Sequence, residues 1–138
     1  MTLATAHLVG QVMTKGMVTV RAGARLEEAA QVMDAQRVHG VVVLDDESTE
    51  VVGVLSQTDL LRARASDVWA NLSGVPVRLV MTAPALTISI DADLDDATRL
   101  MKHRRVHRLV VIGHDGITPV GVLSLTDLVR VMAGPEAL

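Results

Sequence analysis

The chain has 138 residues and a mass of 14.7 kDa, which is room for one ordinary domain or for two small ones that share a core. Hydrophobic residues make up 49% of it and aromatic residues only 1%, and this aliphatic content excludes a disordered chain. The net charge of −3 argues against non-specific nucleic-acid binding, which depends on excess positive charge. Apolar runs are too short to span a bilayer, a signal peptide is not recognisable and cysteine is absent. We therefore expect a cytoplasmic protein with no nucleic-acid and no membrane partner.

The sequence repeats itself after 68 residues. Residues 12–64 align with residues 80–132 without a gap, and 22 of the 53 aligned pairs are identical. A repeat of this length contains several changes of element, which argues against a solenoid of short repeats. The chain is therefore divided into a first repeat with its N-terminal lead-in (1–65), a connector (66–79) and a second repeat (80–138).

The first repeat is predicted to fold in the order β-α-β-β-α. It opens with a short β-prone segment at Thr19-Val20. A helix follows whose apolar side chains share one face, at Leu26, Ala29, Ala30 and Met33. Two strands are then predicted at Val38–Leu44 and Val51–Leu55, separated by a polar turn. A helix from Thr58 to about Arg64 closes the repeat.

The second repeat shows the same order, with Asp93 as the candidate N-cap of its first helix. The predicted strands are Thr87-Ile88, Val106–Ile112 and Val120–Leu123, and the last helix runs from Thr126 to about Met132. The expected buried face of the first helix consists of Leu94, Ala97, Thr98 and Met101. In the connector, Trp69 is expected to anchor the linker onto the two repeats.

Apolar strands that alternate with amphipathic helices imply an α/β fold in which helices cover each sheet. Each sheet is expected to have about three strands, which is too small to be stable alone. We therefore expect the two repeats to pack sheet against sheet about a pseudo-twofold axis. Clefts would then form where the start of a helix in one repeat faces the first strand of the other.

The end of each repeat carries a Ser-x-x-Asp sequence at the junction of a strand and a helix, Ser56 to Asp59 and Ser124 to Asp127. Backbone N–H groups and the helix dipole favour anions at such a place. An aspartate there can accept two hydrogen bonds from a vicinal diol such as a ribose. The same pattern is also a variant of the capping box, which needs no ligand.

Histidine and arginine side chains gather where the first long strand of each repeat begins. They are His39 and His107, with Arg37, Arg104, Arg105 and Arg108 nearby. A cationic cluster in an acidic protein fits a phosphate pocket, and it equally fits solvated bases at a helix C-terminus. His103 and His107 also have a metal-ligand spacing, but a third ligand is missing, so no metal site is assigned.

Groups that carry out catalysis are not recognisable in the sequence. It has no cysteine, no Gly-x-Ser-x-Gly elbow and no Gly-rich phosphate loop with a lysine. The adjacent acids, such as Asp95 with Asp96, lie at a helix start and complement its dipole. We therefore expect a protein that is not an enzyme.

The chain resembles a tandem pair of CBS domains, often called a Bateman module, from Val12 to Met132. The resemblance rests on Met-Thr opening each repeat, on a Leu-x-x-Ala-x-x-x-Met helix and on Gly-Val-Leu-Ser-x-Thr-Asp-Leu near its end. The second repeat is similar to a nucleotide-binding repeat of the gamma subunit of AMP-activated protein kinase. This resemblance implies an adenosine ligand: AMP, ADP, ATP or, less readily, S-adenosylmethionine.

The resemblance also implies two pockets, each using residues of both repeats. In one pocket, Asp127 would bind the ribose, with the hydroxyls of Ser124 and Thr126 nearby, and His107 and Arg108 would face the phosphates. The adenine would lie against Thr14, Val18 and Thr19. The other pocket would use Asp59, Ser56, Thr58 and His39 in the same way, and its base would lie against Thr82, Leu86 and Thr87. Because Gly40 stands where the second repeat has Arg108, the pocket of Asp127 is expected to bind phosphate better.

We therefore expect a non-catalytic sensor of adenine nucleotides that forms a homodimer. It is expected to signal to a separate effector protein through a change in shape or in dimer packing. The alternative is a ligand-free dimerisation or scaffold module that acts on a partner protein. A third hypothesis, nucleotide hydrolysis, needs a base or a metal that the sequence does not offer.

Overall fold

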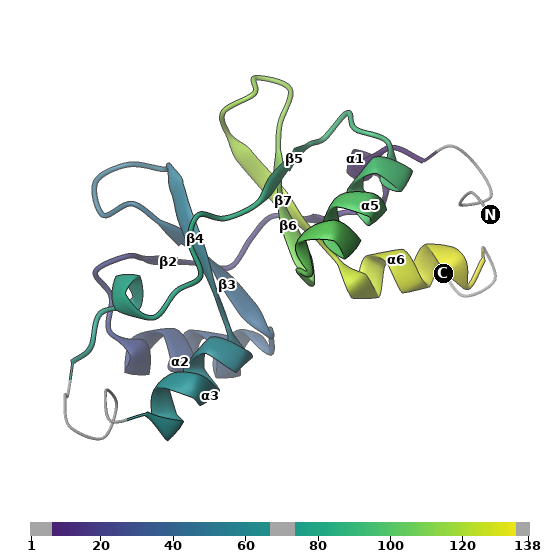
Figure 1. The fold of residues 1–138 in the computed structure, drawn as a ribbon. Helices are drawn as coiled ribbons and strands as arrows, with labels where there is room; N and C mark the ends of the chain where they lie inside the picture. Colours follow the sequence, from purple (N-terminus) through teal and green to yellow (C-terminus); the bar gives the residue numbers. More distant parts are fainter. Residues whose placement is uncertain (1–6, 67–73, 135–138) are drawn as a thin grey trace. The chain divides into compact units, whose positions relative to one another are not determined.

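The computed structural model describes residues 7–66 and 74–134. The chain forms two compact units, each with most of its residue contacts inside the unit (Figure 1). The first unit, Val18–Ala85, holds the body of the first repeat. The second unit combines Met1–Met17 with Leu86–Leu138 and holds the body of the second repeat.

The first unit has the predicted β-α-β-β-α order, followed by a short 3-10 helix. Its elements are β2 (Thr19–Arg21), α2 (Leu26–Gln36), β3 (Gly40–Leu44), β4 (Val51–Ser56), α3 (Gln57–Ala65) and η1 (Val77–Leu79). The strands pair in the order β2-β3-β4, with β2 parallel to β3 and β3 antiparallel to β4. The parallel pair requires a crossover, and α2 supplies it.

The second unit repeats this order and adds two elements from the lead-in. Its elements are α1 (Val9–Val12), β1 (Thr14–Lys15), β5 (Thr87–Ser89), α5 (Leu94–Arg104), β6 (Arg108–Ile112), β7 (Pro119–Ser124) and α6 (Leu125–Met132). The sheet has four strands in the order β1-β7-β6-β5, one more than the sequence suggested. The additional strand is Thr14–Lys15, which pairs antiparallel with Val122 and Gly121 of β7.

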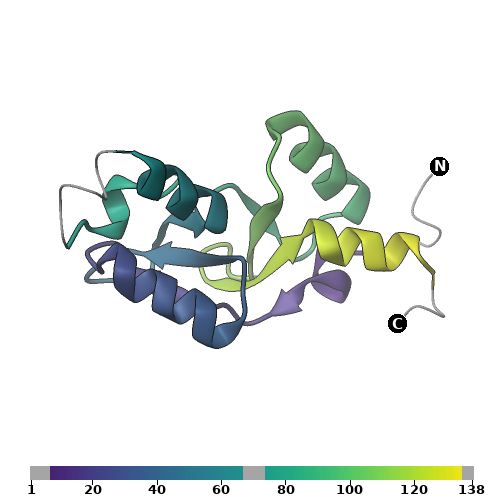
Figure 2. The same ribbon diagram turned by 90° about the horizontal axis from the view of Figure 1, so that it is seen from below.

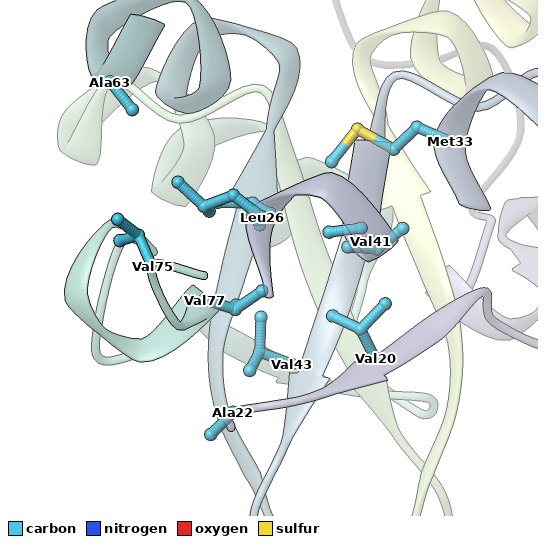
Figure 3. Packing of buried hydrophobic residues seen from close by; sticks show 11 residues of the cluster. Val20, Ala22, Leu26, Met33, Val41, Val43, Ala63, Val75 and Val77 are labelled. Atoms are coloured by element: carbon cyan, nitrogen blue, oxygen red, sulfur yellow. The ribbon is translucent and has the colours of Figure 1, made fainter. Parts of the chain in front are cut away.

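The core of the first unit is one cluster of apolar side chains (Figure 3). Leu26 and Met33 from α2 and Ala63 from α3 meet Val41 and Val43, which alternate along β3 and therefore point to the same face. Because both helices contribute to this cluster, α2 and α3 cover the same face of the sheet, as two views of the ribbon show (Figures 1 and 2). Of the four residues predicted to share the buried face of α2, Leu26, Ala29 and Met33 are in the core, whereas Ala30 is only half-buried.

An equivalent cluster forms the core of the second unit. It contains Leu94 and Met101 of α5 and Leu128 of α6, together with strand residues such as Leu109. Thr98, which the sequence analysis placed on the buried face of α5, is exposed instead. Its hydroxyl donates to the carbonyl of Leu94 at 2.9 Å, so the side chain is satisfied by the preceding helical turn and not by the core. Trp69, expected to anchor the connector, lies outside the described residues.

The lead-in of the first repeat packs on the body of the second. The N–H of Val9 donates to the carbonyl of Ala92 at 2.9 Å, and the N–H of Leu94 donates to the carbonyl of His7 at 2.9 Å. The Val9 side chain is fully buried in the core of the second unit. Residues far apart in the chain thus form one compact unit.

The equivalent segment before the second repeat packs on the body of the first. Val77 lies 68 residues after Val9. Its N–H donates to the carbonyl of Ala24 at 2.7 Å, and the N–H of Leu26 donates to the carbonyl of Val75 at 2.9 Å. The side chain of Val77 is fully buried in the core of the first unit. Each unit therefore consists of the body of one repeat and the lead-in of the other.

The turn between β6 and β7 contains a titratable group with a strongly shifted pKa. The Thr118 hydroxyl donates to Asp115 Oδ2 at 2.5 Å, and the N–H groups of Thr118 and Ile117 donate to Oδ1 at 2.8 Å. These hydrogen bonds lower the pKa of Asp115 from 3.8 to about 2. The Thr118 hydroxyl makes the largest contribution, and the backbone N–H groups make smaller ones. Because the folded pKa lies below the unfolded value, the carboxylate stabilises the turn fully above pH 4 and loses this effect as the pH falls through about 2.

We expect an NMR titration of the Asp115 side-chain carbon to give a midpoint near 2. Thr118→Val removes the hydroxyl donor but keeps the backbone N–H, so the midpoint should move up toward 3.8. A midpoint for Asp115 that is the same in both proteins would contradict the role of the hydroxyl.

Candidate functional site

Each repeat ends in a reciprocal cap at the junction of its last strand and helix. In the first unit, the N–H of Asp59 donates to Ser56 Oγ at 3.1 Å, while Asp59 Oδ2 accepts from the Ser56 N–H at 2.9 Å and from the Ser56 hydroxyl at 3.1 Å. The serine is the N-cap of α3, and the aspartate lies three residues later, in the first turn. This is a capping box, and it satisfies two of the free donors at the helix start.

The second unit has the same cap with nearly the same distances. Asp127 Oδ2 accepts from the N–H and the hydroxyl of Ser124 at 2.9 and 3.1 Å, and the Asp127 N–H donates back to Ser124 Oγ at 3.3 Å. The capping interpretation of the Ser-x-x-Asp pattern is therefore confirmed in both repeats. The cap accounts for the Oδ2 atom of each carboxylate and leaves the Oδ1 atom for other partners.

Both aspartates are buried, which is unusual for a side chain that only caps a helix. Asp59 is 6% exposed and Asp127 is 1% exposed, and they are the only buried charged residues among those described. A buried carboxylate is costly unless several donors surround it. Within the described part of the chain, every buried side-chain polar atom has a hydrogen-bond partner.

A threonine of the crossing lead-in supplies a donor to Oδ1 of each carboxylate. The Thr14 hydroxyl donates to Asp127 Oδ1 at 3.2 Å, and the Thr82 hydroxyl donates to Asp59 Oδ1, also at 3.2 Å. Thr14 and Asp127 both belong to the second unit, and Thr82 and Asp59 both belong to the first. The structure thus brings together Thr14 with Asp127 and Thr82 with Asp59.

The lead-in can approach because a glycine lies against the carbonyl group of each threonine. A Cβ atom on Gly121 would lie 2.4 Å from the Thr14 carbonyl oxygen, and one on Gly53 would lie 2.8 Å from the Thr82 carbonyl oxygen. Any side chain at these glycines would collide with the backbone of the lead-in. The Gly-Val-Leu-Ser sequence therefore holds the lead-in against the strand and positions the buried aspartate at the helix start.

The two carboxylates differ in one further partner. Arg130 donates from Nη1 to Asp127 Oδ1 at 3.0 Å, and the two residues are an i, i+3 pair on α6. Arg62 occupies the equivalent position after Asp59, but within the described residues it forms no ion pair or hydrogen bond with that aspartate. Arg130 is not among the residues predicted from the sequence, although the Asp-x-x-Arg spacing on a predicted helix indicates such a pair.

The predicted phosphate-facing side chains lie beside these caps. His39 and His107 are exposed, and their carbonyls accept from the first N–H of α3 and of α6 at 3.0 Å. Thr58 and Thr126 are exposed in the first turn of the same two helices. Arg108 is half-buried at the start of β6.

The other arginines of the expected cationic cluster mark the ends of helices. Arg37 and Arg105 follow α2 and α5 in the left-handed conformation, with φ of 55° and 54°, and both are exposed. This conformation is uncommon for a residue other than glycine. Arg104 is the last residue of α5, where a base complements the helix dipole.

The residues expected to line the base, apart from Thr14 and Thr82, lie at the start of the first strand of each repeat. Val18 precedes β2 and Thr19 begins it, with the Val18 carbonyl accepting from the Val42 N–H at 3.0 Å. Leu86 and Thr87 hold the same places at β5 in the second unit. Thr14 is thus in the second unit, whereas Val18 and Thr19 are in the first.

A cavity of about 300 Å³ opens in the second unit between the end of α5 and the start of α6. Its floor includes Met101 and Leu128, and its rim carries Lys102, Arg105 and His107. Of the residues assigned to the two predicted pockets, only His107 lines it, and Arg105 of the expected cationic cluster lies beside it. A cluster of three or more potential metal ligands does not occur anywhere in the described residues.

Both repeats, each with its cap and buried aspartate, fall within the match to one family model. The CBS domain model matches residues 9–66 and again residues 75–134. The chain belongs to the CBS domain family. The predicted resemblance and the predicted α/β fold of two CBS repeats are therefore confirmed.

Several proteins are similar to this CBS pair. An uncharacterized protein of Methanopyrus kandleri is 27% identical over 125 residues, which is 89% of this chain and 61% of that protein. The chain thus spans less than two thirds of the length of that relative. In the described part of the present chain, no helix is long and apolar enough to cross a membrane.

Two similar solved structures contain adenine nucleotides. CBSX2 in complex with AMP is 28% identical, with a TM-score of 0.76 over 92% of this chain and 96% of that chain. The CBS domain of a bacterial CNNM/CorC family Mg²⁺ transporter in complex with ATP is 26% identical, with a TM-score of 0.78 over 92% of this chain and 87% of that chain. Adenine nucleotide binding therefore occurs among proteins similar to this CBS pair.

Proposed function

We propose that this CBS pair is a non-catalytic regulatory module of the cytoplasm that binds adenosine-containing ligands such as AMP, ADP or ATP. The observation that carries the proposal is a buried aspartate at the start of a helix in each unit, Asp59 and Asp127, with one carboxylate oxygen directed away from the cap. A second support is that similar structures contain AMP and ATP. S-adenosylmethionine is a further candidate of the same chemical class.

The ligand chemistry follows from the donors and acceptors around each carboxylate. A ribose offers two neighbouring hydroxyl donors, and a carboxylate is the side chain best suited to accept both. Thr126 lies one residue before Asp127 in the first turn of α6, where free N–H groups and the helix dipole favour a phosphate. His107 and Arg108 add basic groups at the start of β6. In the first unit, Thr58 is the counterpart of Thr126 and His39 is the counterpart of His107, whereas Gly40 stands in place of Arg108.

The proposed signal passes through the crossing lead-ins. Thr14 contacts Asp127 in the second unit, and the chain enters the first unit four residues later, at Val18. Thr82 contacts Asp59 in the first unit, and the chain enters the second unit at Leu86. A ligand that takes the place of either threonine at its carboxylate would alter the segment that joins the units. A ligand changes the shape or the dimer packing only if it binds one of two conformations more tightly than the other. Displacement of the threonine would provide this difference in affinity.

A second candidate function is dimerisation or partner binding without any ligand. It is favoured by three exposed apolar side chains along α6, Leu125, Val129 and Met132, which are spaced for one helical face. The equivalent positions of α3 are Gln57, Leu61 and Arg64, so α6 is the more apolar of the two. A homodimer is part of both proposals, and only the first requires a nucleotide.

Thermal denaturation of the purified chain separates the two candidates. After removal of co-purified nucleotide, the protein is mixed with AMP, ADP, ATP or S-adenosylmethionine, and with CMP as a ribonucleotide control. A ligand at 100 times its dissociation constant should stabilise the folded protein by about 2.7 kcal/mol, which is a shift of several degrees. We expect a shift with at least one adenosine compound and none with CMP. No shift with any of them would leave the scaffold as the function.

A further inference from the structure

The proposed sites of the two units are not equivalent, and Arg130 is the reason. Its guanidinium lies 3.0 Å from Oδ1 of Asp127, and its side chain is 45% exposed. The same oxygen also accepts from Thr14 at 3.2 Å. The ion pair thus joins a buried carboxylate to a cation that reaches into solvent.

The acceptor sites of Asp127 are all used in this arrangement. A carboxylate oxygen has two lone pairs for hydrogen bonds. Oδ2 accepts twice from Ser124, and Oδ1 accepts from Thr14 and Arg130. A vicinal diol can bind this carboxylate only if some of these donors leave. Arg130 is the donor with the most freedom to do so, because it is exposed and belongs neither to the cap nor to the lead-in.

Asp59 provides a matched comparison within the same chain. Its Oδ2 also accepts twice from the cap serine, with a longer contact to Thr82 at 3.4 Å. Its Oδ1 accepts only from Thr82, at 3.2 Å. The equivalent arginine, Arg62, is exposed and does not contact Asp59 in the described structure. One acceptor position of this carboxylate is therefore open, whereas the corresponding position in the second unit is filled.

We propose that Arg130 competes with the ligand's diol for Asp127 and thereby makes the second site select phosphorylated ligands over neutral nucleosides. This inference rests on the proposed function. When a neutral nucleoside binds, the guanidinium loses its carboxylate and gains nothing in return. When a nucleotide binds, the ligand brings an anionic group that attracts the displaced cation. The first site has no such competitor and binds nucleoside and nucleotide with more similar affinity.

The test is a comparison of adenosine with AMP by isothermal titration calorimetry. The proteins are the wild type, Arg130→Gln and the matched control Arg62→Gln. For Arg130→Gln we expect the affinity of the weaker site for adenosine to rise about three- to tenfold. The ratio of AMP affinity to adenosine affinity at this site should therefore be smaller than in the wild type. Arg62→Gln should leave adenosine affinity within about twofold. Arg130→Lys keeps a cation without the planar guanidinium and should lie between the wild type and Arg130→Gln.

Ionic strength gives a second readout that a merely structural role of Arg130 would not produce. Adenosine is uncharged, so salt acts on its affinity only through charges of the protein. Because salt screens a partly exposed ion pair, raising sodium chloride from 50 to 500 mM should strengthen adenosine binding at the weaker site of the wild type. The same change should have little effect on Arg130→Gln.

The possible failures are distinguishable. If the wild type binds neither adenosine nor AMP, the proposed function is wrong, and the inference about Arg130 is wrong with it. If both ligands bind but Arg130→Gln and Arg62→Gln behave alike, or if salt acts equally on wild type and Arg130→Gln, only the inference is overturned. Melting curves of the four proteins without ligand show whether a change in affinity comes from loss of fold.

Discussion

Gly121→Ala is expected to destabilise the second unit by about 3 kcal/mol, which is large for the addition of one methyl group. The new Cβ atom would lie 2.4 Å from the Thr14 carbonyl oxygen and 3.0 Å from the Met13 sulfur. The nearest atom belongs to the backbone of β1, which pairs directly with β7 and cannot move without breaking that pairing. Overpacking of this kind typically costs about 1–3 kcal/mol, and loss of the strand pair adds to it. Urea denaturation followed by circular dichroism measures the difference in unfolding free energy.

Two other glycines serve as controls for this substitution. Gly53→Ala places a Cβ atom 2.8 Å from both the Met81 sulfur and the Thr82 carbonyl oxygen, so it should destabilise the first unit through the same contact with the other lead-in. Gly116→Ala meets no atom within 4 Å, but its φ of +73° disfavours a side chain, so its cost should be about 1 kcal/mol. Hydrogen exchange identifies the unit that loosens in each variant. Equal destabilisation by Gly121→Ala and Gly116→Ala would contradict the close approach of the lead-in.

The order of elements within each repeat was predictable because local patterns determine it. Leu26, Ala29 and Met33 recur at helical spacing, and all three are buried on α2. The apolar run that ends at Leu44 could only be a buried strand, since polar turns bound it and it is too short for most helices. The exact 68-residue repeat then transferred each assignment to the second half of the chain.

The crossing of the lead-ins was not predictable in the same way. The two repeats share 22 of 53 aligned residues, so they offer closely similar surfaces to either lead-in. Local periodicity can show that Val9 is apolar, but it does not show which of two similar sheets will bury it. The resemblance placed Thr14 near Asp127 as part of a base-binding wall, whereas in the structure its hydroxyl donates directly to the carboxylate.

The Arg130 contact was missed for a different reason. Two arginines have the same spacing from their aspartates, at positions 62 and 130, so the sequence predicts the same pairing for both. The structure distinguishes them through side-chain conformation, which the pattern of residue types does not determine. The predicted difference between the pockets rested on Gly40 and Arg108, and the structure adds this second difference at the carboxylates themselves.

Asp127→Asn should weaken binding of an adenosine ligand at the second site by at least about a hundredfold. The amide has nearly the size of the carboxylate, and its oxygen can still accept from the Ser124 N–H, so the cap is preserved in part. It has no charge, and one of the two acceptor oxygens is replaced by an NH2 donor, so the side chain can no longer accept a hydrogen bond from a diol hydroxyl at each end. Two charge-assisted hydrogen bonds contribute about 1.5–3 kcal/mol each, and 1.4 kcal/mol corresponds to a factor of ten in affinity.

Asp59→Asn is the matched control, because it makes the same change at the equivalent place in the first unit. If each aspartate serves its own site, calorimetry with AMP should show that each variant loses one class of site and retains the other, while the double variant binds nothing. The retained site also demonstrates that each single variant is folded. The two losses should differ in one respect: Asp59→Asn removes a carboxylate with an open acceptor, whereas Asp127→Asn also releases Arg130. A double variant that binds AMP as tightly as the wild type would show that the buried aspartates are caps only.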